Sequence, residues 1–271
     1  VEIADNVITN TERTPITAYS GADVRIHNNQ LSGAGEGSGI AVYSSKAEIH
    51  NNDIGPIGGW NGLWLLGSFD VIAENNSISD TAREPILAGE YGNQAPSPTP
   101  ARLYLANNTI STQGSGECSS QKWWDGSFTC PAIMAHRSGA TIVDNEINAG
   151  GSADGIRATG ALLDVRRNIF NVQGTGAILQ HYDSGFADSQ QYGTLAFFSN
   201  NEWNGVSVTY NVSKSSVTVQ SEYIPSPPPD EHPVLLSWAD QEAWVQNGWQ
   251  NGIIPHEVRA CDTCVDFTPY N

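Results

Sequence analysis

The stretch Val24-Arg25-Ile26-His27-Asn28-Asn29-Gln30-Leu31 decides the fold of this chain, because its centre recurs. Each copy holds an asparagine, then any residue, then an Ile, a Leu or an aromatic residue. Four of the seven steps between copies are 23 or 24 residues long, and the other three are 32, 33 and 37 residues. A fixed period with loop-sized excess predicts a solenoid in which each copy is one coil. The repeated asparagines are Asn6, Asn29, Asn52, Asn76, Asn108, Asn145, Asn168 and Asn201.

A second short segment lies in the middle of each copy. In it apolar residues alternate with variable ones, as in Ile40-Ala41-Val42-Tyr43 and Ile156-Arg157-Ala158-Thr159. This alternation predicts a β-strand with one buried face. Because so short a strand cannot bury that face alone, we expect each strand to stack on its copy from the next coil, about 4.8 Å away. The predicted strands are 15–19, 39–43, 62–66, 85–89, 132–136, 155–159, 176–180 and 205–209.

The repeated asparagines are predicted to have a structural role. Asn tolerates the left-handed conformation that a sharp corner needs, and stacked Asn amides can hydrogen-bond along the solenoid as a ladder. The chain also holds three N-glycosylation motifs, and two of them overlap this asparagine column, where a buried amide is a poor acceptor. The motifs are Asn75-Asn76-Ser77, Asn107-Asn108-Thr109 and Asn211-Val212-Ser213.

With its Asn-x-Ile turns followed by Gly-Ile-x-(small) strands, the chain resembles the right-handed parallel β-helix superfamily, which includes pectate-lyase-like and NosD-like repeat proteins. The resemblance covers roughly residues 1–224. It implies an all-β, right-handed, single-stranded parallel β-helix of about eight or nine coils. It leaves function open, since such scaffolds host lyases, hydrolases, epimerases, tailspikes and adhesins.

Composition narrows the range of partners and compartments. The 271 residues carry a formal net charge of −17, with a pI near 4.5. Such a surface argues against nucleic acids and anionic membranes as partners. It suits an extracellular or cell-surface location or the binding of divalent cations such as Ca²⁺, although no cofactor is predicted. No apolar run reaches membrane-spanning length, and the chain opens on Val1, which favours a processed or excised chain.

The four cysteines form two pairs in the sequence, Cys118 with Cys130 and Cys261 with Cys264. An even count in a chain with few lysines predicts disulfides formed in an oxidising compartment. The first pair would staple the base of the longest insertion, and the second would close a small loop. No metal site is predicted, because a zinc site at the second pair lacks two further ligands.

The sequence changes character after residue 224, so we expect a solenoid over 1–224 and a C-terminal appendage over 225–271. The appendage opens with the proline-rich stretch Pro225-Ser226-Pro227-Pro228-Pro229, which is a stiff linker. A short helix is predicted from Ser237, as its N-cap, to about Asn247. The tryptophans of this piece must be buried, either by capping the last coil or by folding back over the outward strand face.

The outward face of the predicted strands is unusually apolar and aromatic at its centre. An apolar face of this kind indicates a partner, a glycan or coverage by the appendage. The first outward column runs through Thr17, Ala41, Trp64, Leu87, Met134, Arg157, Ile178 and Ser207, and the second runs from Tyr19 and Tyr43 through His136 and Gln180 to Thr209. The predicted ligand-binding residues are Tyr19, Tyr43, Trp60, Trp64 and Met134.

A polar cluster beside this face is the candidate catalytic site. Elimination from a uronate glycan needs a base for the C5 proton and a cation beside the carboxylate. His136 or His181 could act as the base, Tyr182 as the acid, and Arg157 or Arg137 as the cation. Arg157, like Arg166 and Arg167, can equally pair with one of the many surplus acids. The predicted cluster is His136, Arg137, Arg157, His181, Tyr182 and Asp183.

Two functions follow from these patterns. The first is an extracellular β-helix that acts by binding carbohydrate or by assembling with a neighbouring subunit, in the manner of a structural or adhesin-like protein. The second is a polysaccharide lyase or epimerase that uses the polar cluster. The chain lacks the calcium-binding Asp cluster and the Lys/Arg pairing of pectate lyases, which favours the first. A glycosidase is disfavoured because the outward columns hold no carboxylate pair.

Overall fold

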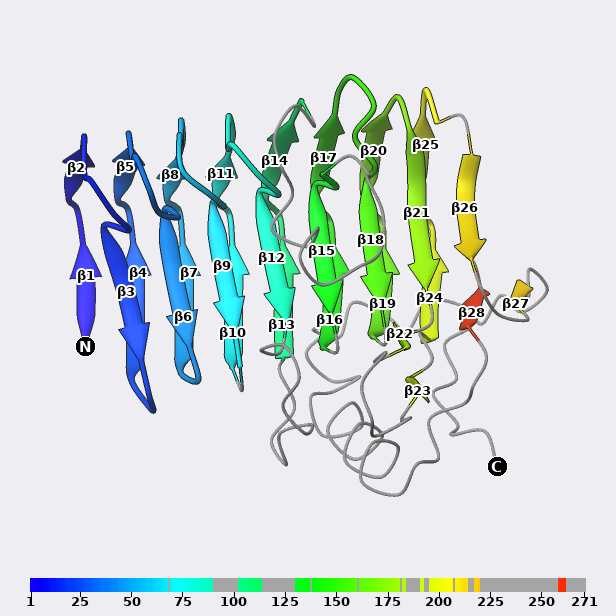
Figure 1. Ribbon diagram of the computed structural model, residues 1–271, viewed down its shortest axis with the longest axis horizontal. Coiled ribbons are helices and arrows are strands. Elements are labelled where there is room, and N and C mark those ends of the chain that lie inside the picture. The colour runs from blue at the N-terminus through cyan, green and yellow to red at the C-terminus, as the bar shows by residue number, and fades with distance from the viewer. Residues whose placement is uncertain are drawn as a thin grey trace.

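The computed structural model describes residues 1–67, 69–89, 102–113, 130–136, 138–159, 161–180, 182–183, 191–192, 195–206, 208–213, 217–219 and 258–261. Every regular element within these ranges is a β-strand. The strands form three parallel sheets of ten, eight and eight strands, together with a two-stranded antiparallel pair. Figure 1 shows successive coils side by side along the long axis of the molecule.

Three strands make up one coil, and each joins a different sheet. Sheet A, in spatial order, holds β1 (Glu2–Ala4), β4 (Asp23–His27), β7 (Lys46–His50), β10 (Asp70–Glu74), β13 (Arg102–Ala106), β16 (Gly139–Val143), β19 (Leu162–Arg166), β24 (Leu195–Ser199), β28 (Val258–Cys261) and β27 (Val217–Val219). Sheet B holds β2 (Val7–Thr9), β5 (Gln30–Ser32), β8 (Asp53–Ile54), β11 (Ser77–Ile78), β14 (Thr109–Thr112), β17 (Glu146–Ala149), β20 (Ile169–Val172) and β25 (Glu202–Asn204). Sheet C holds β3 (Ile16–Tyr19), β6 (Ile40–Tyr43), β9 (Leu63–Leu66), β12 (Ile86–Gly89), β15 (Ile133–His136), β18 (Ile156–Thr159), β21 (Thr175–Gln180) and β26 (Val208–Ser213).

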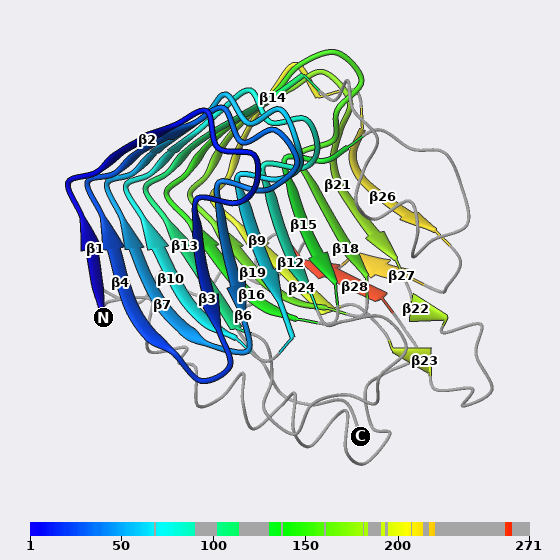
Figure 2. The ribbon, with the colours of Figure 1, turned by 60° about the vertical axis from the view of Figure 1, so that its left-hand side comes forward.

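The chain therefore folds as a parallel β-helix, as its repeat predicts. Seen from the N-terminal end in Figure 2, each coil runs clockwise through sheets A, B and C as it recedes, so the solenoid is right-handed. Strands of the same sheet pair in parallel with their copies one coil away, for example Ile40 with Leu63 and Ile133 with Ile156. This pairing satisfies the backbone of strands that are too short to be stable alone.

The recurring stretch Val24–Leu31 is two strands joined at a corner, β4 and the start of β5. The structure corrects which asparagine makes the corner. The left-handed residue precedes the ladder asparagine, and its φ lies between 53 and 58° in every coil. Asp, Asn and a single Arg occupy this position, although left-handed geometry costs an L-residue about 1–2 kcal/mol. These corner residues are Asp5, Asn28, Asn51, Asn75, Asn107, Asp144, Arg167 and Asn200.

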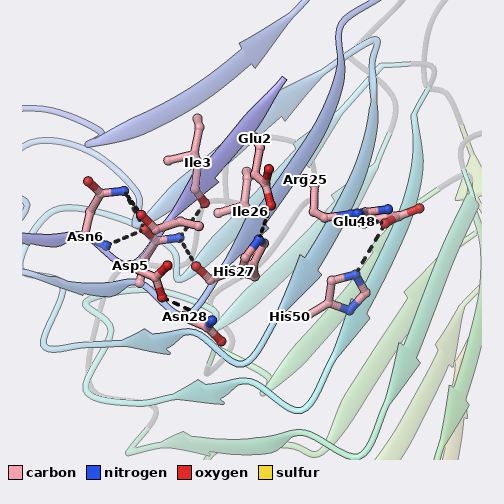
Figure 3. Close-up of polar contacts among 12 residues, drawn as sticks. Glu2, Ile3, Asp5, Asn6, Arg25, Ile26, His27, Asn28, Glu48 and His50 are labelled. Carbon is pink, nitrogen blue, oxygen red and sulfur yellow. Dashed lines mark hydrogen bonds and ion pairs between the residues drawn. The ribbon is translucent and has the colours of Figure 1, made fainter.

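The predicted asparagine ladder is confirmed inside this corner. Asn29, for example, donates its side-chain amide to the Asn52 side-chain oxygen at 3.0 Å and to the backbone oxygen of His27 at 2.9 Å. The same pattern continues from rung to rung as far as Asn201. Corner residues of neighbouring coils can also bond to each other on the outer side of the turn, as where the Asn28 side-chain amide donates to the Asp5 carboxylate at 3.2 Å (Figure 3). The ladder thus satisfies backbone groups that the turn leaves without strand partners.

The core is the interior enclosed by the three sheets. The inward positions of sheet C are buried as predicted, with Ile40, Leu63, Ile133 and Ile156 all at 0 % exposure. In the C-terminal coils aromatic rings replace aliphatic ones, and Phe170 stacks on Trp203 with ring centroids 4.2 Å apart. A continuous apolar column along the axis is what fixes the register of every strand, since a slip of one residue would turn that column outward.

Two features near the C-terminus depart from or extend the predictions. The register of β26 pairs Ile178 with Asn211, so Asn211 and Ser213 take the places that we predicted for Ser207 and Thr209. Strand β28, from the appendage, inserts between β24 and β27 in sheet A and pairs in parallel with both. At least this part of the appendage therefore continues the solenoid. The proline-rich linker and the predicted helix 237–247 lie outside the described residues.

Candidate functional site

A row of aromatic side chains lies on the outward face of sheet C in the first three coils. Tyr19 and Tyr43 stack in parallel, with centroids 4.8 Å apart and planes within 6°. Tyr43 meets Trp64 of the next coil edge-on, at 5.4 Å and 68°. Because these residues are direct register partners or diagonal neighbours on adjacent parallel strands, the row follows from the strand pairing itself.

Trp60, in the turn that precedes β9, extends this row sideways. Its ring meets Trp64 at 4.5 Å and 87°, and the Arg83 guanidinium lies 5.4 Å from the Trp60 ring centroid. The backbone aligns these groups, since the Arg83 N–H donates to the Trp60 oxygen at 3.1 Å. The ring planes differ by 68° and 87°, so the cluster presents ring faces in more than one direction. We call Tyr19, Tyr43, Trp60 and Trp64 the aromatic row.

Among the sheet C residues whose side chains the structure describes, the outward face is exposed only at its N-terminal end. Tyr19 is 63 % exposed, and Tyr43 and Trp64 are partly exposed. Further along, Leu66 and Met134 are 1 % and 0 % exposed. Met134 was predicted with the aromatic residues as ligand-binding, but it is buried rather than presented to solvent. The accessible part of the predicted binding face is thus the aromatic row.

The structure brings together only part of the predicted polar cluster. His136 and Arg157 lie on adjacent strands of sheet C, β15 and β18, but they are 1 % and 5 % exposed rather than solvated. Arg157 donates to Asp154 at 3.1 Å, and burial lowers the pKa of its guanidinium. Arg137 and His181 lie outside the described residues. Tyr182 and Asp183 form β22 (Tyr182–Asp183), which pairs with β23 (Gln191–Tyr192) in a separate two-stranded sheet.

Sequence reasoning missed a buried polar row in the turn before sheet C. Glu84 is fully buried and accepts a hydrogen bond from the Asn61 amide at 3.1 Å. Asp154, 6 % exposed, accepts from the backbone N–H of Thr175 and from Arg157. Asn61, Glu84 and Asp154 each stand two residues before the first residue of their sheet C strand, and this constant offset was the available signal. The charges of Asp154 and Glu84 oppose the lowering of the Arg157 pKa by burial.

A second buried polar group lies on the outward face of sheet A. Tyr104, Thr141 and Asp164 are register partners on β13, β16 and β19, and each is nearly buried. Asp164 accepts a hydrogen bond from Arg166 at 2.6 Å, yet burial raises the pKa of Asp164. Burial, aided by the negative charges of Glu74 and Asp144, raises the pKa of Tyr104 to about 12. The strand alternation predicts these positions as outward but not as buried.

The first coils carry a network of ion pairs on the outward face of sheet A (Figure 3). His27 contacts Glu2 at 2.7 Å, and Arg25 pairs with Glu48 at 2.8 Å. His50 lies 3.7 Å from Glu48. Hydrogen bonds from His27 and from Arg25 lower the pKa values of Glu2 and Glu48, respectively. No group of three or more His, Cys, Asp or Glu side chains with metal-binding geometry occurs among the residues that the structure describes.

The cysteine pairings stay predictions. Cys130 is buried at 1 % exposure, three residues before β15 begins. Cys118 and Cys264 lie outside the described residues, and the side chain of Cys261 in β28 is also outside them.

The described parts of the chain thus offer two accessible groups of side chains, the aromatic rings beside Arg83 on sheet C and the exposed ion-pair network around Arg25 and Glu48 on sheet A. The polar cluster that the sequence predicts is not assembled as an accessible site within those parts. No helix long and apolar enough to cross a membrane occurs in those parts either. Comparisons of the chain with protein-family models, with curated proteins and with solved structures find no match.

Proposed function

We propose that this β-helix acts by binding carbohydrate on the aromatic row of sheet C, at a cell surface or in an extracellular medium. The observation that carries the proposal is the run of four aromatic rings over three consecutive coils, which ends at the 63 % exposed Tyr19. A continuous exposed aromatic surface is uncommon on a soluble chain and indicates a ligand. The spacing of parallel strands repeats the rings at the interval of about 4.8 Å along the solenoid, which suits an extended, repetitive ligand.

Aromatic rings suit sugars because both partners are amphipathic. A pyranose has one apolar C–H face and a rim of hydroxyl groups, and a Tyr or Trp ring offers an apolar face with a polar tip. The exposed Tyr19 places a hydroxyl group at one end of the row, and the Arg83 guanidinium lies over the Trp60 ring at the other end. The net charge of −17 makes nucleic acid an unfavourable ligand for the same rings.

Shortening an exposed ring of the row is expected to weaken glycan binding without harming the fold. We expect Tyr19→Ala to lower the affinity for a retained polysaccharide about 10-fold, because aromatic anchors commonly contribute more than 1 kcal/mol at binding surfaces. Tyr43→Ala should cost more, since it also removes the stacking partner of Tyr19. Affinity electrophoresis in gels that contain single polysaccharides, both neutral and uronate-containing, measures the change.

Val7→Ala is the matched control. Val7 is 71 % exposed in the same coil but lies on sheet B. This variant should migrate like the parent chain in every polysaccharide gel. Retention of no polysaccharide by the parent chain, or equal retention by Tyr43→Ala and Val7→Ala, contradicts the proposal.

A polysaccharide lyase or epimerase is the second candidate, supported by the placement of His136 and Arg157 on adjacent strands of one face. At 1 % and 5 % exposure, neither side chain is accessible to a polymer in this structure. If this candidate is correct, uronate glycans should yield unsaturated sugars with new ultraviolet absorbance, and His136→Ala should abolish the signal. Activity that persists in a His136→Ala, His181→Ala double variant removes this site assignment.

A further inference from the structure

The corner between sheets A and B separates two kinds of asparagine that the sequence places side by side. In the motif Asn75-Asn76-Ser77 the acceptor is Asn75, and it is a corner residue with φ of 56°, not a ladder residue. The same holds for Asn107, with φ of 53°, in the next coil. The sequence-based expectation that these two motifs fall on buried amides is therefore wrong, because only the second residue of each motif belongs to the ladder.

Burial and bonding differ sharply between the two kinds. Asn76 is 2 % exposed, and its amide donates to Asn108 and to the backbone oxygen of Ile49. Asn75 is exposed, and so is Asn107. Within the described residues neither of these two amides takes part in a hydrogen bond, whereas the corner amide of Asn28 donates to Asp5 at 3.2 Å. The two acceptor amides thus project into solvent with their donors available.

The hydroxyl residue at the third position of each motif is also exposed. Ser77 and Thr109 are register partners at the start of β11 and β14, and both are exposed on the outward face of sheet B. The motif chemistry needs a hydroxyl two residues after the acceptor, and it excludes proline between them. Here the intervening residue is Asn76 or Asn108, which the ladder holds inward, so acceptor and hydroxyl both remain on the outer side of the chain.

We propose that Asn75 and Asn107 are acceptor sites for N-linked glycans. The donor is a lipid-linked oligosaccharide diphosphate. The side-chain amide nitrogen of the asparagine forms a bond to the anomeric carbon of the first sugar, the bond from that carbon to the diphosphate oxygen breaks, and the amide gives up one proton. The lipid diphosphate leaves, and no oxidant or reductant is needed.

The fold tolerates a glycan at this place for two physical reasons. The ladder does not use the acceptor amides, so the new bond leaves every hydrogen bond of Asn76 and Asn108 intact. Figure 2 shows the corner between sheets A and B on the edge of the solenoid that is opposite to sheet C. A glycan there projects away from the aromatic row, so this inference stands or falls independently of the proposed carbohydrate binding.

The test is expression of the full chain, behind a signal peptide, in a eukaryotic secretory host. A C-terminal tag with its own acceptor motif reports entry into the glycosylating compartment, and Ser213→Ala silences the third motif. Peptide mass spectrometry after amidase release of glycans should find Asn75 and Asn107 converted to aspartate. Ser77→Ala and Thr109→Ala should each remove one glycan, although both acceptors are retained.

A gain-of-site variant supplies the matched control. Asp53→Thr places a hydroxyl residue two positions after the corner residue Asn51, in the register row of Ser77. It should add one glycan, on Asn51. The secreted, modified chain should keep the circular dichroism of the unmodified chain. A tag that carries its glycan while Asn75 and Asn107 carry none overturns the proposal, as does modification confined to aggregated chain.

Discussion

Asn145→Ala is expected to destabilise the fold by about 3–5 kcal/mol, because it leaves several buried backbone groups without partners at about 1–3 kcal/mol each. Asn145 is 1 % exposed. Its amide donates to the backbone oxygens of Leu105 and Val143, both at 2.9 Å, and its oxygen accepts from the Asn108 backbone N–H at 2.9 Å. Alanine removes all of these bonds, and the interior offers no water to replace them.

Asn148→Ala, three residues later, is the matched control. The Asn148 side chain points outward from sheet B, where it donates to Glu146 at 3.3 Å and accepts from Asn171 at 2.8 Å. Water can replace both bonds, so we expect a loss of less than about 1 kcal/mol. Urea unfolding followed by circular dichroism measures both variants, with equal slopes required for comparison. Equal destabilisation by the two substitutions contradicts the structural role that we assign to the ladder.

Arg166→Met is the second large effect, with an expected loss of about 3–5 kcal/mol from an unpaired buried charge. Asp164 and Arg166 stand two residues apart on the outward face of β19, and they are 2 % and 7 % exposed. The Arg166 guanidinium donates to Asp164 at 2.6 Å and, together with Arg167, opposes the effect of burial on the pKa of that carboxyl. A methionine leaves the carboxylate with the full cost of desolvation.

The double variant Asp164→Leu, Arg166→Met separates pairing from packing. Replacing both partners of a buried pair by apolar residues is often neutral or stabilising, so we expect it to recover to within about 1 kcal/mol of the parent chain. A double variant as unstable as Arg166→Met shows that the site needs its charges for another reason. Thermal and urea unfolding of the parent chain, Arg166→Met, Asp164→Leu and the double variant complete the cycle.

The pH dependence gives an independent check of the same pair. Burial raises the pKa of Asp164 in the folded chain above that in the unfolded chain. At a pH between these two pKa values the folded chain binds more protons than the unfolded chain. This carboxyl therefore makes the free energy of unfolding fall as the pH rises. In Arg166→Met the pKa of Asp164 in the folded chain rises further. The loss of stability relative to the parent chain should therefore be smallest at acidic pH and grow toward neutral pH. In the double variant this contribution should be absent.

Much of the fold could be predicted because it depends on periodicity. The asparagine spacing predicts the coils, and the alternation in 40–43 or 156–159 predicts which residues face the core, as the structure confirms. The prediction failed where two patterns competed. Val206 and Val208 fit the alternation as well as Tyr210 and Val212 do, and only the pairing of β26 with β21 selects the second pair as the partners of Ala177 and Leu179. The corner residue was also misplaced by one position, because both positions are commonly Asn.

The candidate site was predictable only in part. Strand register predicts that Tyr19, Tyr43 and Trp64 lie in a row, and they do. It does not predict that Met134 and His136 on the same face are buried. Nor could the sequence separate the exposed acceptor Asn75 from its buried neighbour Asn76, because the two differ only in backbone conformation at the corner.

By itself the sequence determined the period, the strand alternation and the asparagine ladder, since each of these is a relation between a residue and its copy one coil away. Only the tertiary structure decided which outward positions are open to solvent, which asparagine carries the positive φ, and where the strand 258–261 joins sheet A. These properties depend on contacts between segments that the repeat does not relate to one another. A local sequence pattern does not report such contacts.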